Sequence, residues 1–211
     1  MIMKPCAILI GILVLSGCAG QGQVVPLDVG ATPSGHQEAV QSKDALKALI
    51  VPFEDQRSEK RRIGTRTHFW GGNTYFTVRD DKPGDVIAHA LADYLKQKGW
   101  QTWVSAPGGP VVANPSGGLD VMVTGQIMDF SVNAKSRFGS TRIVVKTKVA
   151  LQAQHTLDGS ISRMTLNGSR SETVFWFEPK DMEEAINQML KESLDRLMAD
   201  AKVENRLLQI K

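Results

Sequence analysis

Residues 141–157, TRIVVKTKVALQAQHTL, decide the fold of this chain. Apolar and polar side chains alternate along them with the period of two that a β-strand imposes. The side chains expected on the buried face are Ile143, Val145, Thr147, Val149 and Leu151. Those expected on the solvated face are Arg142, Lys146, Lys148 and Gln152. One buried and one solvated face is typical of a strand in an antiparallel sheet.

Two more strands are expected beside this one, over residues 119–138 and 160–177. Gly139-Ser140 and Asp158-Gly159 supply the tight turns that antiparallel neighbours need. The second half of the chain therefore predicts a three-stranded antiparallel meander.

Two amphipathic helices are expected, over residues 83–98 and 179–203. Pro83 suits the first turn of a helix, and Gly99 suits the position just after its end. The apolar stripe of the first helix contains Ile87, Leu91, Tyr94 and Leu95. That of the second contains Met182, Ile186, Met189, Leu190 and Leu197. Each stripe needs an apolar surface to pack against.

The first half of the chain predicts a parallel unit. The continuous apolar run of residues 45–53, which Pro52 ends, indicates a strand buried on both faces. Residues 100–104 form a short strand after the first helix, and a strand–helix–strand order implies parallel pairing. The predicted fold class is α+β: a mixed β-sheet with one parallel βαβ-like unit and an antiparallel meander, and two helices packed on one face.

The N-terminus has the features of a secretory signal peptide. Lys4 precedes an apolar run from Ala7 that ends at Leu15-Ser16-Gly17-Cys18, and polarity returns at Gly20. A membrane span would need roughly 20 apolar residues, so the run is too short to be one.

Leu15-Ser16-Gly17-Cys18 resembles the lipobox of bacterial lipoproteins. The resemblance implies that the signal is cut before Cys18, and that Cys18 carries the lipid. The only other cysteine, Cys6, lies in the signal, so the mature chain would hold one odd thiol that acylation explains. The alternative is an ordinary secreted protein with a chance Cys18. Ala19, where the family's inner-membrane retention signal has Asp, favours the outer membrane.

Three segments are expected: a lipoprotein signal peptide over 1–17, the acylated Cys18 with a flexible tether over 18–43, and one α+β periplasmic domain over 44–211. Gly, Pro and short polar residues dominate the tether. Val24-Val25-Pro26-Leu27 is an apolar exception that could dock on the domain.

Residues 54–82 are an expected insertion with a basic cluster, whose members are Arg57, Lys60, Arg61, Arg62 and Arg66. Such a cluster could bind phosphates, lipid head groups or a charged glycan. The alternative is a solvated loop whose charges are partly neutralised by Glu54, Asp55 and Glu59.

The same insertion predicts a hairpin, with strands over 68–70 and 74–78 around Gly71-Gly72-Asn73. Phe69 and Trp70 would lie at its tip. Trp176 is expected at the edge of the third meander strand, with the adjacent Phe side chains in the core. Exposed aromatic side chains of this kind mark a protein interface or a membrane contact.

Sequence patterns for several chemistries are absent. The four His residues lack metal-ligand spacing, so no metal site or other cofactor is expected. The Gly-rich residues 108–118 lack the Gly-Lys-Ser/Thr ending of a phosphate loop, and no Gly-x-Ser-x-Gly elbow is present. The net charge of +3 is too small to argue for nucleic acid.

The order of parts resembles the YajG-like family of outer-membrane lipoproteins. The order is a lipobox, a polar tether, a strand that ends in VPFEDQR at 51–57 and a helix that ends in LKQKGW at 95–100. A long meander that LDVMVTG opens at 119–125 and a closing helix follow. The order is also similar to the N-terminal domain of TolB and to ring-forming lipoproteins of envelope machines. It implies a non-catalytic binding or scaffolding module. The alternative is a ring-forming structural subunit of a secretion, polysaccharide-export or flagellar machine. Expected partners are the membrane, through lipid on Cys18, and an envelope protein or a second copy.

The Cys18→Ala variant is expected to stay uncleaved or unacylated, because acylation requires the thiol. Membrane fractionation and electrophoretic mobility measure both properties. A processed Cys18→Ala protein of normal mobility that still partitions into membranes would contradict the lipoprotein interpretation.

Overall fold

The long meander predicted from the alternating pattern is the frame of the molecule. In the computed structural model, which describes residues 22–30, 45–79, 82–106, 118–204 and 207–210, it consists of β7 (Val121–Arg137), β8 (Ser140–His155) and β9 (Ile161–Val174). The strands pair antiparallel. The alternation in β8 is confirmed, since the five side chains expected to be buried are buried and the four expected in solvent are exposed.

On its other edge, β7 carries two separate branches of parallel neighbours. Its first half pairs with β2 (Lys47–Ile50), which pairs with β6 (Gln101–Val104), both in parallel. Its second half pairs in parallel with β4 (Gly64–Thr67). β4 pairs antiparallel with β5 (Asn73–Val78), and β5 pairs in parallel with β1 (Val24–Leu27). The two-residue β3 (Glu54–Asp55) pairs with β7 between them. The sheet is therefore mixed, as predicted.

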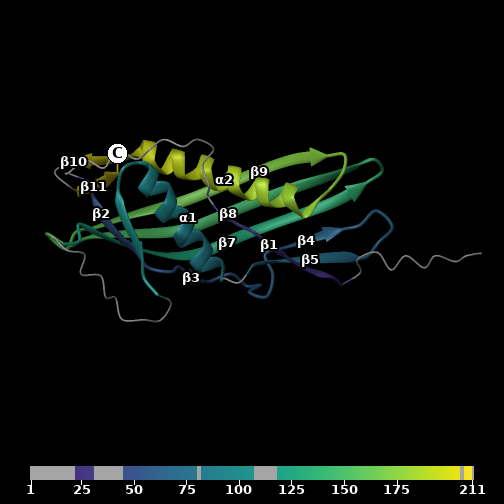
Figure 1. The fold of residues 1–211 in the computed structure, drawn as a ribbon, viewed down its shortest axis with the longest axis horizontal. Helices are drawn as coiled ribbons and strands as arrows, with labels where there is room; N and C mark the ends of the chain where they lie inside the picture. The colour runs from purple at the N-terminus through teal and green to yellow at the C-terminus, as the bar shows by residue number, and fades with distance from the viewer. Residues whose placement is uncertain (1–21, 31–44, 80–81, 107–117, 205–206, 211) are drawn as a thin grey trace, which may run out of the picture.

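Both helices, α1 (Pro83–Gln97) and α2 (Pro179–Asp200), lie on the same face of the sheet (Figure 1). α1 contacts β2, β3, β6 and β7, whereas α2 contacts β8, β9 and β1. The apolar stripes predicted for the two helices point into the core, with Leu197 only partly buried. Tyr94 Oη donates a 2.6 Å hydrogen bond to Asp195 Oδ1 and so ties α1 to α2. The fold is thus α+β, with two helices and a large mixed sheet.

Residues 22–30 of the expected tether belong to the folded domain. β1 pairs in parallel with β5, and Leu27 is fully buried. The predicted docking of Val24-Val25-Pro26-Leu27 is therefore confirmed. Burial of the apolar side chain offsets the entropy cost of ordering a short segment. Residues 31–44 and Cys18 lie outside the described residues.

The second helix is shorter than the one predicted over residues 179–203, and strands follow it. α2 ends at Asp200, and β10 (Ala201–Glu204) pairs antiparallel with β11 (Leu207–Ile210). The register places Val203 opposite Leu208.

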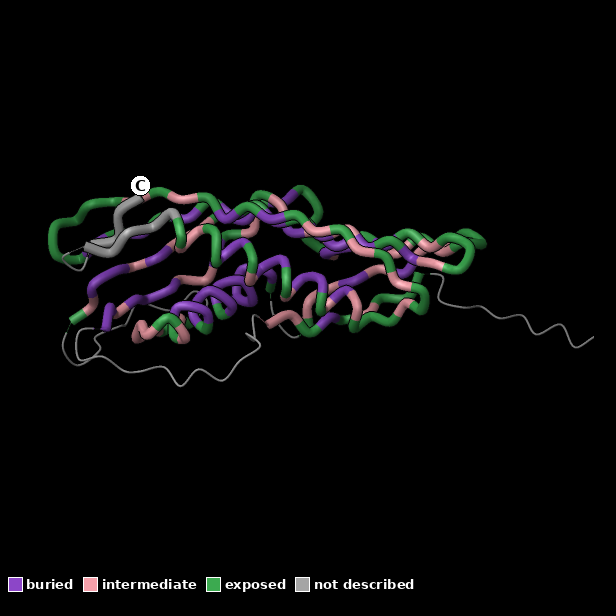
Figure 2. The backbone as a smooth tube through the Cα atoms, turned by 90° about the horizontal axis from the view of Figure 1, so that it is seen from above, coloured by how far each residue is buried: buried purple, intermediate pink, exposed green. Residues whose placement is uncertain are grey.

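Buried residues run through the layer between the helices and the sheet, while the tips of the long strands are exposed (Figure 2). No helix in the described part of the chain is both long and apolar enough to cross a membrane.

Replacing Gly168 with Ala is expected to destabilise the domain by about 1–3 kcal/mol, the usual cost of overpacking a core. A Cβ there would lie 2.2 Å from Ser193 Oγ and 2.5 Å from Met189 Sδ, so α2 would have to move off β9. Urea unfolding measures the loss. Ser169→Ala, at the exposed neighbouring position, is the control and should change the free energy of unfolding by roughly 0.5 kcal/mol or less. Equal behaviour of the two variants would contradict the close packing of α2.

Candidate functional site

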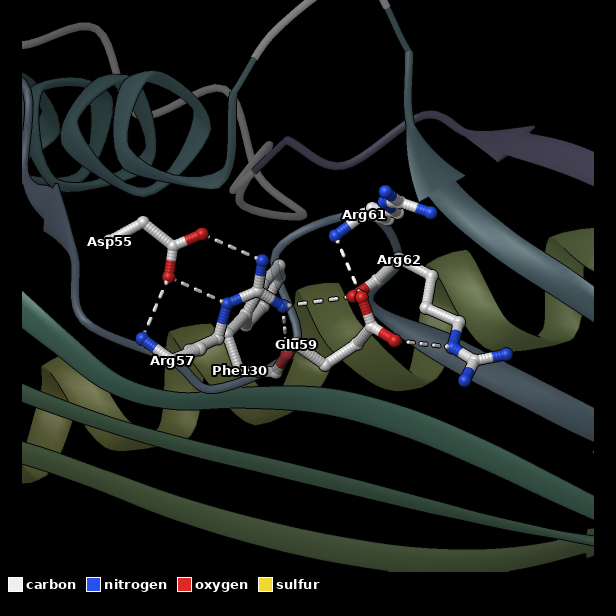
Figure 3. A network of polar contacts seen from close by, with 6 residues as sticks. All are labelled: Asp55, Arg57, Glu59, Arg61, Arg62 and Phe130. Atoms are coloured by element: carbon white, nitrogen blue, oxygen red, sulfur yellow. Dashed lines mark hydrogen bonds and ion pairs between the residues drawn. The ribbon is translucent and has the colours of Figure 1, made fainter.

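Arg57, the first member of the basic cluster, points inward. Only 7% of it is exposed. Its Nη2 donates to Asp55 Oδ2 at 2.8 Å and its Nε to Asp55 Oδ1 at 2.9 Å. Its Nη1 donates to the backbone carbonyls of Phe130 at 3.0 Å and Arg62 at 3.2 Å (Figure 3). The guanidinium is therefore held by the protein itself and is not presented to a ligand.

The position of Arg57 follows from a gap in the sheet. β3 pairs with β7 at residues 126–127 and β4 pairs with it at 132–135, and the register of β7 with β8 shifts between Ile127 and Asp129. The carbonyl of Phe130 falls in this gap, where no strand bonds to it along that edge among the described residues. A buried carbonyl without a donor costs free energy, and the guanidinium provides a charged one.

Asp55 holds Arg57 in place. Burial by itself would raise the pKa of the Asp55 carboxyl, but the hydrogen bonds and positive charge of Arg57 outweigh burial, so the pKa lies below its ordinary value of 3.8. Asp55 is therefore ionised at neutral pH, and the pair is stabilising there. This stabilisation is present above about pH 3.8 and is lost as the pH falls through the lowered pKa.

The other basic residues separate into two places. Arg62 Nε donates to Glu59 Oε2 at 3.0 Å, and its guanidinium lies 4.5 Å from the centre of the Tyr75 ring. Lys60 and Arg61 are exposed beside it. Arg66 instead lies over the Phe177 ring at 4.1 Å and donates to Ser136 Oγ. The five cations predicted as one ligand contact are thus in three places. Arg57 is buried, Lys60, Arg61 and Arg62 lie together on the surface, and Arg66 lies apart from them.

Next to Arg57 the loop and β7 enclose a polar cleft of about 430 Å³. The loop and β4 contribute Arg57, Ser58, Glu59, Arg62, Ile63, Gly64 and Thr65, and β7 contributes Met128, Asp129, Phe130, Ser131 and Asn133. Positive and negative side chains occur together, so the cleft does not select for anions. Its hydroxyl and amide groups suit a polar ligand or a polar protein segment. Sequence reasoning missed the β7 residues, although their alternation with buried neighbours could have indicated a polar strand face.

The predicted aromatic positions are exposed. The hairpin is present, but residues 68–70 form its turn and not a strand, because Gly71 and Gly72 have φ of +90° and +83° and reverse the chain there. Phe69, Trp70 and Trp176 are 49%, 92% and 90% exposed.

Phe138 and Phe175 are also largely exposed, which was not predicted. Phe138, in the turn between β7 and β8, is 90% exposed. Phe175 was expected in the core, but β9 ends at Val174 and not at 177, and its side chain is 82% exposed. Phe177 packs as expected, with its ring centre 6.4 Å from that of the buried Phe76.

In the described part of the chain, no group of three or more His, Cys, Asp or Glu side chains lies close enough to hold a metal ion.

No protein-family model matches this sequence, and no curated protein matches it either. Solved structures of similar fold include a protein from Xanthomonas campestris, at 10% identity and a TM-score of 0.48, covering 83% of this chain and 92% of that one. A lipoprotein from Neisseria meningitidis is 11% identical with a TM-score of 0.37, covering 73% and 98%. A homologue of a neuraminyllactose-binding hemagglutinin from Helicobacter pylori is 10% identical with a TM-score of 0.36, covering 82% and 89%. A likeness at this level transfers neither a family nor an activity to this chain.

Replacing Arg57 with Met is expected to destabilise the domain by about 2–4 kcal/mol, because Asp55 and the Phe130 carbonyl lose their buried partner. Arg61→Met, at an exposed position, is the control and should change stability by roughly 0.5 kcal/mol or less. Chemical unfolding at several pH values measures both.

The difference between the wild type and Arg57→Met should shrink below about pH 3.8, where Asp55 takes up a proton. An Arg57→Met protein as stable as Arg61→Met would contradict the bridging role of Arg57.

Proposed function

We propose that this chain is a lipoprotein held in the outer membrane through acylated Cys18, with its folded domain in the periplasm. The lipobox-like Leu15-Ser16-Gly17-Cys18 and the following Ala19 support this proposal. The lipobox implies three acyl chains, and two or more anchor a protein stably where one binds reversibly. The finer likeness to the YajG-like lipoproteins is part of the same proposal.

The observation that carries the proposal is the place where the described fold begins. The Gly22 N–H donates to the Asn73 carbonyl at 2.8 Å, and β1 continues from there into the sheet. Gly22 follows Cys18 by four residues, a length that spans at most about 14 Å. A lipid on Cys18 would therefore hold the domain at the bilayer surface and not on the longer tether that composition predicts.

We infer a role in binding or scaffolding rather than in catalysis. Around the polar cleft, Arg57 pairs with Asp55 and Arg62 pairs with Glu59. Charges neutralised by each other in this way suit recognition of a polar surface more than proton transfer. The cleft supplies hydroxyl, amide and backbone groups that could fix the orientation of such a partner.

A ring-forming structural subunit is the second candidate, and the outer edge of β9 favours it. β9 is 14 residues long, and among the described strands it pairs only with β8. A long edge of unpaired backbone groups is a template for pairing with another chain. A head-to-tail contact through this edge would form a ring if the rotation closes.

Acylated protein purified in mild detergent is expected to be a monomer in its micelle. Light scattering coupled to size-exclusion chromatography measures the protein mass. The Cys18→Ala protein produced without residues 1–17 is the control, since it separates association through the fold from the sharing of a micelle. A symmetric oligomer of fixed stoichiometry in both samples would overturn the monomeric binding module and support the ring subunit.

A further inference from the structure

Exposed aromatic side chains gather at one end of the molecule because of the strand directions. β4 runs parallel to β7, and β9 also runs parallel to β7 because both pair antiparallel with β8. The carboxyl ends of these three strands therefore meet at the same end, on the right in Figure 1. Each is followed by exposed aromatic residues: Phe69 and Trp70 after β4, Phe138 after β7, and Phe175 and Trp176 after β9. These five residues are called the aromatic end below.

The aromatic end is partly assembled already. The Phe69 ring lies edge-on to the Trp70 ring, with their centres 4.8 Å apart, and its centre is 6.4 Å from that of Phe138. Two loops distant in sequence thus share one aromatic group. The four most exposed members have 82% to 92% of their surface in water. Such a concentration of large apolar side chains is unfavourable in water and marks a contact surface.

The course of the N-terminal chain indicates what covers this surface. Gly22 bonds to Asn73, which begins β5 directly after the hairpin tip that carries Trp70. β1 runs parallel to β5, so the chain enters the fold at the aromatic end. Cys18 is only four residues earlier, within about 14 Å along the chain. A lipid on Cys18 would bring the aromatic end, and not the opposite end, to the bilayer.

The chemistry of the aromatic end suits the interfacial layer of a membrane, where Trp rings are enriched. The exposed charged residues near the rings are Lys135, Arg137 and Arg142, with Glu178 of opposite sign. The apolar area of the rings is a driving force that salt does not screen, so the salt dependence of binding separates it from attraction to anionic lipid. Rings on separate loop tips can each insert between lipid head groups. A flat protein partner would not require rings on separate loops.

We propose that the aromatic end is a membrane-docking surface that inserts Trp70, Trp176 and the neighbouring Phe rings into the phospholipid interface beside the acyl chains of Cys18. The inference rests on the proposed lipid anchor. It gives the domain a fixed orientation, with the meander rising from the bilayer. β7 has 17 residues, so the opposite end would stand roughly 55 Å away.

The test uses the acylated full-length protein in phosphatidylcholine vesicles that contain brominated chains, which quench nearby Trp fluorescence. One variant, Trp100→Phe with Trp103→Phe, keeps Trp70 and Trp176. The matched variant, Trp70→Phe with Trp176→Phe, keeps Trp103 in β6 and Trp100 just before it. Strong quenching and a blue shift are expected in the first variant and little in the second. Equal or absent quenching in the first variant would overturn the docking, and mass analysis of Cys18 reports separately whether the lipid anchor exists.

A second measurement removes the anchor. The Cys18→Ser protein, produced without its signal, is mixed with the same vesicles and floated on a density gradient. Trp70→Ser with Trp176→Ser should lower its partition coefficient by about tenfold or more, and the control Trp103→Ser should not. The effect should persist at high salt and without anionic lipid. All variants should melt within a few degrees of the parent, since the two residues lie outside the core.

Loss of binding in high salt would show that charge and not aromatic burial drives the contact. Unchanged flotation of the Trp70→Ser, Trp176→Ser protein would assign the aromatic end to a protein partner. Either outcome overturns the docking inference and leaves the lipid anchor standing.

Discussion

The hydrogen bond from Arg57 to the Phe130 carbonyl closes a gap on which the two halves of the sheet depend. β7 is one continuous strand. β8 pairs with one edge of it, and β2 and β4 pair with different parts of the other edge. Between these branches the loop after β3 supplies the missing bonds: Gln56 N–H donates to Ile127, Arg57 to Phe130, and Val132 N–H to Ile63. Without these hydrogen bonds the backbone of a buried stretch of β7 would lack hydrogen-bond partners, which a folded protein avoids.

The length of β7 also determines where the exposed aromatic loops and the polar cleft lie. A strand of 17 residues reaches beyond the layer that the helices cover, so its carboxyl end emerges from the core while Val121 at its other end stays buried (Figures 1 and 2). Because β4 and β9 run in its direction, their following loops emerge with it. Five aromatic residues in those loops are exposed together, whereas Phe177, the last one after β9, packs against the buried Phe76. The polar cleft lies at the gap in the middle of the same strand, away from that end.

Alternation was enough to predict the meander and amphipathic stripes were enough to predict both helices, because each is a local pattern read at a fixed period. The parallel unit was predicted from the order of strand, helix and strand along the chain. Arg57 could not be placed this way. Its neighbours in sequence are polar or charged, and only the gap in β7, a property of pairing between distant strands, turns it inward. The grouping of Phe138 with Phe69 depends likewise on the parallel register of β4 and β7. Exposure of Trp70 was predictable, because two glycines follow it.

The docking of β1 would link the proposed anchor on Cys18 to the orientation of the domain. A long flexible tether would let the domain rotate freely, and exposed rings would then meet the bilayer only by chance. Gly22 is bonded to Asn73 and β1 to β5, and Cys18 precedes Gly22 by four residues, so a lipid there would raise the effective concentration of the aromatic end at the membrane. Weak insertion of each ring would suffice under that condition. In the proposed arrangement the short connection to Cys18 and the apolar rings near it would act together, and neither would need to bind strongly alone.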